Sequence, residues 1–314
     1  MPSPYTCLWV YRMHILFLFL DGVGLGADNA AINPFATATL PMLQGFTHGR
    51  RWLADVGTHA TERALFIPTD AQLGVAGPPQ SGSSQAVILT GQNVPQIIGE
   101  HYGPKPNAQT RDIIAHDNIF KQVRERGKTS ALLDAYPPTL LASIARGKTL
   151  PSSIQQAAMN AGQTLFSKDD LIAKRALTPE WTGHAWHKHL KLTDTPLYTP
   201  YEAGQMLAKI SRQHDFAFHS HWMTDYVGHR GPLSDGVELL ETFDGVMAGL
   251  LDAWEDDEGL ILMTSDHGNL EDIDNRHHTE NRVPTLIIGA QKEAFAAGFD
   301  NLTDFYPRVL RALF

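Results

Sequence analysis

The segment HILFLFLDG, residues 14–22, decides the fold class of this 314-residue chain. Its apolar run from Ile15 to Leu20 stops abruptly at Asp21-Gly22. A short, continuous apolar run is typical of a parallel strand that is covered on both faces. Similar runs follow along the chain, and we expect them to be parallel strands of the same sheet: residues 129–136, 216–223, 260–263 and 284–289.

Helical patterns lie between these runs. Residues 200–212 and 236–254 carry apolar side chains at steps of three and four, which indicates amphipathic helices. Strands that alternate with helices predict an α/β fold with a doubly wound, mostly parallel sheet. The middle of the chain is different, because it is rich in proline and contains the basic, histidine-rich stretch HAWHKHLKL at 184–192. We therefore predict an extension at 1–12, a core of residues 13–100 and 199–314, and a smaller inserted cap domain at 101–198.

Composition excludes several classes of protein. The 43% hydrophobic content is that of a globular chain, which excludes disordered and fibrous proteins. The net charge of −9 argues against a nucleic-acid partner, because binding to the phosphate backbone needs clustered basic side chains. The single cysteine, Cys7, fits a reducing compartment. The run at 15–20 is too short to span a membrane and lacks the cleavage site of a signal peptide, so we expect a cytoplasmic protein without a membrane partner.

Acidic and histidine side chains flank four of the predicted strands. In open α/β sheets, ligands bind beyond the carboxyl ends of the strands, so these side chains should meet in one crevice. Carboxylate and imidazole groups suit divalent first-row metals, and the set is large enough for two ions. Each residue alone could be a turn or a helix cap, but their joint occurrence favours metal ligands. The candidates are Asp21, Asp225, His229, Asp266, His267 and His278.

The stretch Gly22-Val-Gly-Leu-Gly26 invites comparison with a dinucleotide-binding loop. The third glycine of that motif is replaced by Ala27, and the preceding Asp21 would repel a pyrophosphate. We therefore reject this interpretation.

The segment PPQSGSSQ, residues 78–85, supplies a candidate nucleophile. We expect a loop here, followed by a helix that begins in AVILTG at 86–91. A hydroxyl at a helix N-terminus beside two cations can lose its proton and attack phosphorus, while backbone N–H groups hold the anion. The alternative is a flexible serine-rich loop, but the nearby metal candidates favour the nucleophile.

These motifs, in this order, resemble those of the alkaline phosphatase superfamily, and of the branch that contains cofactor-independent phosphoglycerate mutase and phosphopentomutase. The matching segments are Asp21-Gly22, the serine loop, DYVGH at 225–229, SDHGNLE at 265–271 and HTENRVP at 278–284.

The resemblance implies two metal sites, with Mn²⁺ favoured and Zn²⁺ possible. One site would contain Asp225, His229 and His278. The other would contain Asp21, Asp266, His267 and the nucleophile hydroxyl. Ser81 takes the nucleophile position, but Ser84-Gln85 stand where this branch usually has Gly-His, so Ser83 competes for the role.

The expected function is two-metal phosphoryl transfer from a small phosphorylated metabolite through a phosphoserine, as in a phosphatase or a phosphomutase. The alternative is a metal-dependent binding or regulatory protein without turnover, which the altered Ser84-Gln85 pair favours. The arginine-rich substrate motif of the mutases has no match in residues 101–198. Four basic side chains there could meet a phosphate, although a solvated basic face is favoured: His184, His187, His189 and Lys191.

Overall fold

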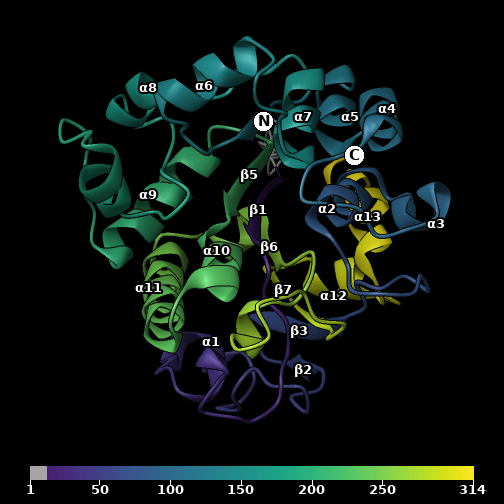
Figure 1. Cartoon of the computed structure of the whole chain (residues 1–314), viewed down its shortest axis with the longest axis vertical. Helices are drawn as coiled ribbons and strands as arrows, with labels where there is room; N and C mark the ends of the chain where they lie inside the picture. Colours follow the sequence, from purple (N-terminus) through teal and green to yellow (C-terminus); the bar gives the residue numbers. More distant parts are fainter. Residues whose placement is uncertain (1–12) are drawn as a thin grey trace, which may run out of the picture.

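The computed structural model describes residues 13–314 as a seven-stranded sheet with helices on both faces (Figure 1). The strand order is β2-β3-β7-β6-β1-β5-β4. Four neighbouring strands are parallel: β4 (Ser130–Leu132), β5 (Phe216–His221), β1 (His14–Leu20) and β6 (Gly259–Thr264). The doubly wound α/β fold is confirmed, whereas the predicted extension at 1–12, with Cys7, lies outside the described residues.

Burial on both faces of the sheet explains why the sequence of β1 is continuously apolar. Every residue of β1 is buried. Leu16, Leu18 and Leu20 face one layer, and Ile15 and Phe17 face the other. The first layer contains α9 (Pro200–Ser211) and α11 (Leu233–Asp252), which pack against each other and confirm the two predicted helices.

A second layer of helices covers the opposite face of the sheet. Its helices are α2 (Ser81–Thr90), α3 (Val94–Ile98), α4 (Ala108–His116), α5 (Ile119–Glu125), α7 (Ser153–Asn160), α12 (Lys292–Ala296) and α13 (Phe305–Leu313). The remaining α-helices are α1 (Pro41–Gly45), α6 (Pro138–Ala145), α8 (Lys168–Ile172) and α10 (Met223–Arg230). Short 3₁₀ or π segments are η1 (Pro34–Ala36), η2 (Trp186–Leu190), η3 (Asp256–Glu258), η4 (Leu270–Asp272) and η5 (Leu302–Asp304).

The prediction that all the strong strands are parallel is wrong for the last one. Strand β7 (Val283–Ile288) runs antiparallel to β6 and to β3 (Ala64–Thr69), and β3 pairs antiparallel with β2 (His59–Ala60). The connection from β6 to β7 contains only the short η4 and lacks the α-helix that usually forms the crossover of a parallel pair. The antiparallel direction means that β7 begins, and β3 ends, at the edge where the parallel strands end.

Residues 101–198 are not shown as a separate cap domain. Their strand β4 pairs with β5 in the central sheet. Ile114 of α4, Phe120 of α5 and Ile154 of α7 belong to the same core cluster as Phe17 of β1. Among the described residues, only a small cluster lies apart from the two main core clusters, and its buried members are Ala135, Leu171, Ala176 and Trp186. Much of the segment predicted to be a cap is therefore part of the core.

The membrane prediction can be compared with the helices directly. Between residues 13 and 314, no helix is both long and apolar enough to cross a bilayer.

The central aromatic cluster gives a test of the core. Phe17 is fully buried, stacks on Phe218 with ring centroids 4.8 Å apart, and meets the edge of Phe305 at 5.1 Å. Phe17→Ala should lower the free energy of unfolding by about 3–5 kcal/mol, because it leaves a cavity between the sheet and α13. Urea denaturation measures the change. The control Leu150→Ala removes an exposed apolar side chain and should cost less than about 0.5 kcal/mol. Equal losses in the two variants would contradict this packing.

Candidate metal centre

Asp21 and Gly22 end β1 at the edge where the polar side chains gather. Gly22 has a φ of 71°, and a Cβ atom built on it would lie 2.8 Å from Asp225 Oδ1. Only glycine can turn the chain here without displacing that carboxylate. The Asp-Gly pair therefore places the buried Asp21 and leaves room for Asp225.

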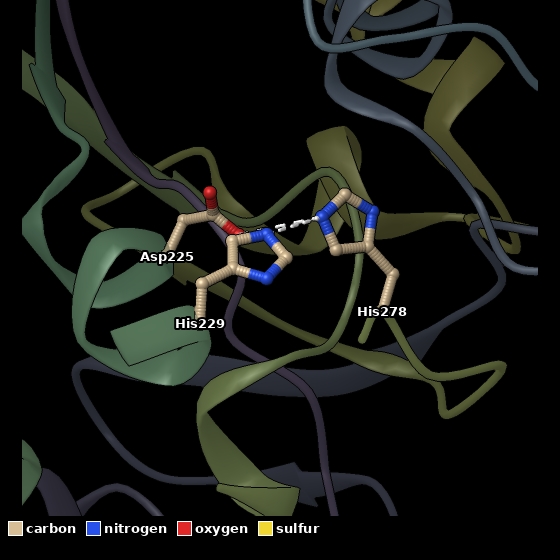
Figure 2. Close-up of side chains that lie close together, drawn as sticks. All are labelled: Asp225, His229 and His278. Carbon is tan, nitrogen blue, oxygen red and sulfur yellow. Dashed lines mark hydrogen bonds and ion pairs between the residues drawn. The ribbon is translucent and has the colours of Figure 1, made fainter. Parts of the chain in front are cut away.

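Helix α10 presents two of the predicted ligands. Asp225 and His229 are four residues apart, so they lie one turn apart on the same helix face. Asp225 Oδ1 is 3.4 Å from His229 Nε2 and 3.5 Å from Nε2 of His278, which precedes β7 (Figure 2). The two Nε2 atoms are themselves 3.1 Å apart. Donor atoms of these three side chains could therefore hold one ion.

A second group surrounds His267, which follows β6. Its Nε2 atom is 3.3 Å from Asp21 Oδ1, 3.5 Å from Asp266 Oδ2 and 3.0 Å from Ser81 Oγ. Asp21, Asp225 and His267 also form a set whose donor atoms could share an ion. Asp225 thus belongs to both groups, and the seven predicted site residues converge at one edge of the sheet.

Ser81 lies at this edge because of a strand, β3, that was not predicted from the sequence. Strand β3 ends there at Thr69, and the following loop leads back to α2, whose first residue is Ser81. The prediction that the helix begins at residue 86 is wrong. A Cβ atom on Gly82 would lie 2.7 Å from the carbonyl oxygens of Tyr102 and Lys105, so glycine lets the first turn of α2 pack against that loop.

The three histidines are held with Nε2 facing inward. Nδ1 of His229 is 2.8 Å from the carbonyl oxygen of Arg276, and Nδ1 of His278 is 2.9 Å from that of Pro79. Nδ1 of His267 lies 3.3 Å from the carbonyl oxygen of Gly268. Because a carbonyl only accepts hydrogen bonds, each Nδ1 is assigned as the donor, so the Nε2 lone pair of each ring is available to a ligand when the ring is neutral.

Electrostatics of the centre favour a cation. Burial, followed by the charge of Asp266, raises the pKa of Asp21 well above its ordinary value. Burial also raises the pKa of Asp266. For His267, burial alone would lower the pKa, but the charges of Asp266, Asp21 and Asp225 together raise it to about 10. The charged forms of Asp21 and Asp266 are therefore disfavoured by burial, and a cation among these carboxylates would stabilise them.

The described atoms fit divalent metal ions. Asp21 Oδ1 is buried and has no hydrogen-bond partner among residues 13–314. The lone pairs on Nε2 of His229 and His278 face each other at 3.1 Å, an arrangement that a cation between them would stabilise. Oxygen and imidazole donors without thiolates suit first-row divalent ions.

Glu271 braces the loops that carry the ligands, and the sequence analysis gave it no role. Its buried carboxylate accepts hydrogen bonds from the backbone N–H groups of Gly24 and Asn269, at 2.9 and 2.8 Å. It also accepts from Asn281 Nδ2 at 2.9 Å and from the Thr279 hydroxyl. One carboxylate thus joins the segment after β1 to both ends of the β6–β7 connection, which explains Glu271 in SDHGNLE and Thr279 and Asn281 in HTENRVP.

Asn269 is a second residue at the centre for which the sequence predicted no role. Its Nδ2 donates to Asp225 Oδ1 at 2.7 Å and to the backbone oxygen of Asp225 at 3.2 Å. Burial alone would raise the pKa of Asp225, but the contact with His278, the charge of His267 and this contact with Asn269 hold it well below its ordinary value. The asparagine therefore fixes the orientation of the carboxylate that both ligand groups share.

Other candidates from the sequence lie away from the centre. Ser83 is fully buried, donates to the carbonyl of Gln80 and accepts from the backbone N–H of Tyr102. His187 Nε2 lies 2.8 Å from the carbonyl oxygen of Thr195. The other basic side chains of the 184–192 stretch are exposed, as a solvated face requires: His184, His189 and Lys191.

The comparisons with known proteins agree with this geometry. Residues 201–313 match the Metalloenzyme superfamily. The 2,3-bisphosphoglycerate-independent phosphoglycerate mutase of Methylobacillus flagellatus is 35% identical over 124 residues, which cover 37% of this chain and 24% of the relative. The enzyme of the same name from Chromobacterium violaceum is 33% identical over 132 residues, covering 38% and 26%. The match thus spans about a quarter of the length of these relatives.

One solved structure supports the fold of the whole chain. The PH0037 protein from Pyrococcus horikoshii superimposes with a TM-score of 0.57 over 97% of each chain, at 15% sequence identity. The resemblance found in the motifs is therefore confirmed in sequence for residues 201–313, and the fold is shared with the PH0037 protein.

The buried histidine His221, beside the centre, gives a test of how burial affects protonation there. His221 ends β5, stacks on Trp181 with ring centroids 4.0 Å apart, and has Nδ1 2.7 Å from the carbonyl oxygen of Pro179. Burial lowers the pKa of His221 to about 3. As the pH falls, the imidazole of His221 therefore takes up a proton in the unfolded chain before it does so in the folded protein. The stability that comes from keeping His221 neutral is complete above about pH 6.5 and is lost as the pH falls toward 3.

The variant His221→Phe keeps a ring against Trp181 but cannot titrate. Between pH 7 and pH 4.5, it should lose about 2–3 kcal/mol less free energy of unfolding than the parent protein. Urea denaturation at both pH values, with a chelator present, measures the difference. An identical pH dependence in the two proteins would contradict a neutral, buried His221.

Proposed function

We propose that the chain is a two-metal phosphoryl-transfer enzyme that acts on a small phosphomonoester, with Ser81 as nucleophile. One observation carries the proposal: the Ser81 hydroxyl begins a buried helix and lies 3.0 Å from His267 Nε2, where two Asp/His groups meet. No side chain caps the N-terminus of α2. The N–H of Ser83 donates to the carbonyl of Tyr102, so the N–H groups of Ser81 and Gly82 are the ones that can hold an anion beside that hydroxyl.

The ligand sets follow from the two groups of side chains. We assign Asp225, His229 and His278 to one ion, and Asp21, Asp266, His267 and the Ser81 hydroxyl to the other. Mn²⁺ is favoured and Zn²⁺ is possible, because the donors are oxygen and imidazole nitrogen. Bound ions of this kind lower the pKa of a ligated hydroxyl and neutralise charge on the transferring phosphoryl group.

The proposed covalent step needs no reagent other than the substrate and water. Ser81 Oγ bonds to phosphorus, the bond from phosphorus to the ester oxygen breaks, and the departing alcohol takes a proton from water. The proton of Ser81 leaves to the solvent. A second oxygen nucleophile then releases the phosphoryl group, and that nucleophile is water in a phosphatase or a hydroxyl of the same molecule in a mutase.

The substrate approaches from the side of α10. His229 and Asp225 are the most open ligands, with 35% and 21% of their side chains exposed, whereas His267 and Asp266 are fully buried. Trp222, the N-cap residue of α10, and Tyr226, on the helix itself, are both exposed. We propose that these two rings flank the organic part of the substrate.

Lys105 is a candidate cation near the centre. It lies in the loop whose backbone packs against Gly82 of α2. Burial lowers the pKa of Lys105, and the negative charge of Asp21 partly opposes this effect. A partly buried ammonium group in the field of the site could help to hold a phosphate in the absence of an arginine-rich motif.

The nucleophile assignment is tested by two serine variants. Protein loaded with Mn²⁺ should release phosphate from, or isomerise, at least one member of a panel of phosphoglycerate, pentose phosphates and an aryl phosphate. Ser81→Ala should lower that rate by roughly three orders of magnitude or more while the protein still binds metal. The matched control Ser83→Ala should keep most of the activity, because Ser83 contacts only backbone groups of its own surroundings.

Two outcomes would contradict this proposal. Full activity in Ser81→Ala would exclude a phosphoserine at that position. Specific binding of a phosphorylated metabolite without any turnover, unchanged by Ser81→Ala, would instead support a binding or regulatory protein on the same fold.

Metal content gives an independent test. Protein purified without chelators should contain close to two divalent ions per chain by elemental analysis. Asp225→Asn should lower the content well below that value, because Asp225 belongs to both sets of donor atoms. Wild-type protein that binds no divalent ion, even after incubation with Mn²⁺ or Zn²⁺, would refute the assignment of both sites.

A further inference from the structure

Gln85 stands between two of the carboxylates at the centre. It lies on α2, four residues and therefore about one turn after Ser81, and its side chain is buried. Its Nε2 atom is 3.2 Å from Asp21 Oδ2 and 3.3 Å from Asp266 Oδ2. Both oxygens belong to carboxylates, which accept when charged, so the amide nitrogen of Gln85 faces them and donates one proton to each.

The contacts of Gln85 determine which carboxylate oxygens remain for a ligand. Asp21 Oδ2 is engaged by the amide, whereas Asp21 Oδ1 has no hydrogen-bond partner among the described residues and lies 3.3 Å from His267 Nε2. Asp266 is held from two directions, because its Oδ1 accepts from the N–H of Gly22 at 3.3 Å. The amide thus fixes the rotation of Asp21 so that its free oxygen faces His267.

Two buried carboxylates in one site repel each other, and the amide lies where it reduces that repulsion. Each N–H group of Gln85 places a partial positive charge against one carboxylate. The amide does this without a proton that can dissociate, unlike the histidine that the resemblance leads one to expect at this position. The altered Ser84-Gln85 pair is therefore compatible with an intact ligand set.

We propose that Gln85 is a positioning residue for the metal ion held by Asp21, Asp266, His267 and Ser81. It orients the two carboxylates and leaves the ion at Asp225, His229 and His278 unaffected. This inference rests on the metal sites of the proposed function, but it does not depend on which reaction the protein catalyses or on any turnover.

The test is a calorimetric titration of metal-free protein with Mn²⁺ alone. Wild-type protein should show two binding events. Gln85→Ala should weaken one of them by about 10–100-fold, the usual effect of removing a group that orients a metal ligand, and should leave the other within about threefold. Gln85→Asn keeps an amide but is one methylene shorter, so it cannot reach both carboxylates and should show the same selective loss with a smaller cavity.

Two further variants make the result specific. Ser84→Ala is the matched control, because Ser84 is the buried neighbour on the same helix and its hydroxyl has no hydrogen-bond partner among residues 13–314. It should keep both binding events. His229→Ala should remove the other event, so the one that remains in His229→Ala must be the one that Gln85→Ala weakens.

The outcomes separate this inference from the proposed function. Unchanged affinities in Gln85→Ala and Gln85→Asn, or equal losses at both sites, would overturn the positioning role. A selective loss in a protein that transfers no phosphoryl group would support the role of Gln85 while the proposed reaction fails. If wild-type protein binds no Mn²⁺, both the inference and the proposed metal sites are wrong.

Discussion

The crowding of negative charge at one edge of the sheet is the constraint on which the rest of the structure depends. Asp21, Asp225 and Asp266 lie around the Nε2 atoms of three histidines, and two of these carboxylates are almost wholly buried. Buried carboxylates of like charge are costly unless a cation is present. The elements around the centre are arranged to tolerate this charge, through hydrogen bonds from Gln85, Asn269 and backbone N–H groups.

The topology of the sheet explains how residues far apart in sequence reach this edge. The parallel strands β1, β5 and β6 all end there, which delivers Asp21, helix α10 and Asp266-His267. Antiparallel β7 begins there, so His278 precedes the strand and still joins the site. Strand β3 ends there as well, and its following loop leads to Ser81. A fully parallel sheet would have placed the start of β7 at the opposite edge.

The sequence was sufficient to predict the candidate ligands that the fold brings together, and insufficient to predict the residues that support them. Asp and His residues beside apolar runs carry their own signal, because a strand end and a metal ligand are both visible in the residue types. The pairing direction of β7 and the existence of the strand at Ala64–Thr69 both depend on long-range packing. The residues of that strand alternate between buried and partly exposed over the first four positions, and it contains Pro68. The helical start of α2 at Ser81 was hidden by a composition of glycine and serine that is typical of a loop.

The predicted cap is not shown as a separate domain, for a similar reason. Prolines and basic residues at 101–198 suggested a separate domain, but Ala131 and Phe120 pack within the two main cores and β4 extends the sheet. Roles such as those of Glu271 and Gln85 leave no pattern in a single sequence, because an isolated Glu or Gln has no signature until its partners are placed. Buried hydrogen bonds across loops are therefore the part that only three-dimensional coordinates supply.

The most direct test of the central claim is anomalous X-ray diffraction from crystals soaked in Mn²⁺, with data collected above and below the manganese absorption edge. The account predicts two anomalous peaks in each chain. One should lie among Asp225, His229 and His278, and the other among Asp21, Asp266, His267 and the Ser81 hydroxyl. Fully soaked crystals that show no peak at these side chains, or peaks only elsewhere on the surface, would contradict it.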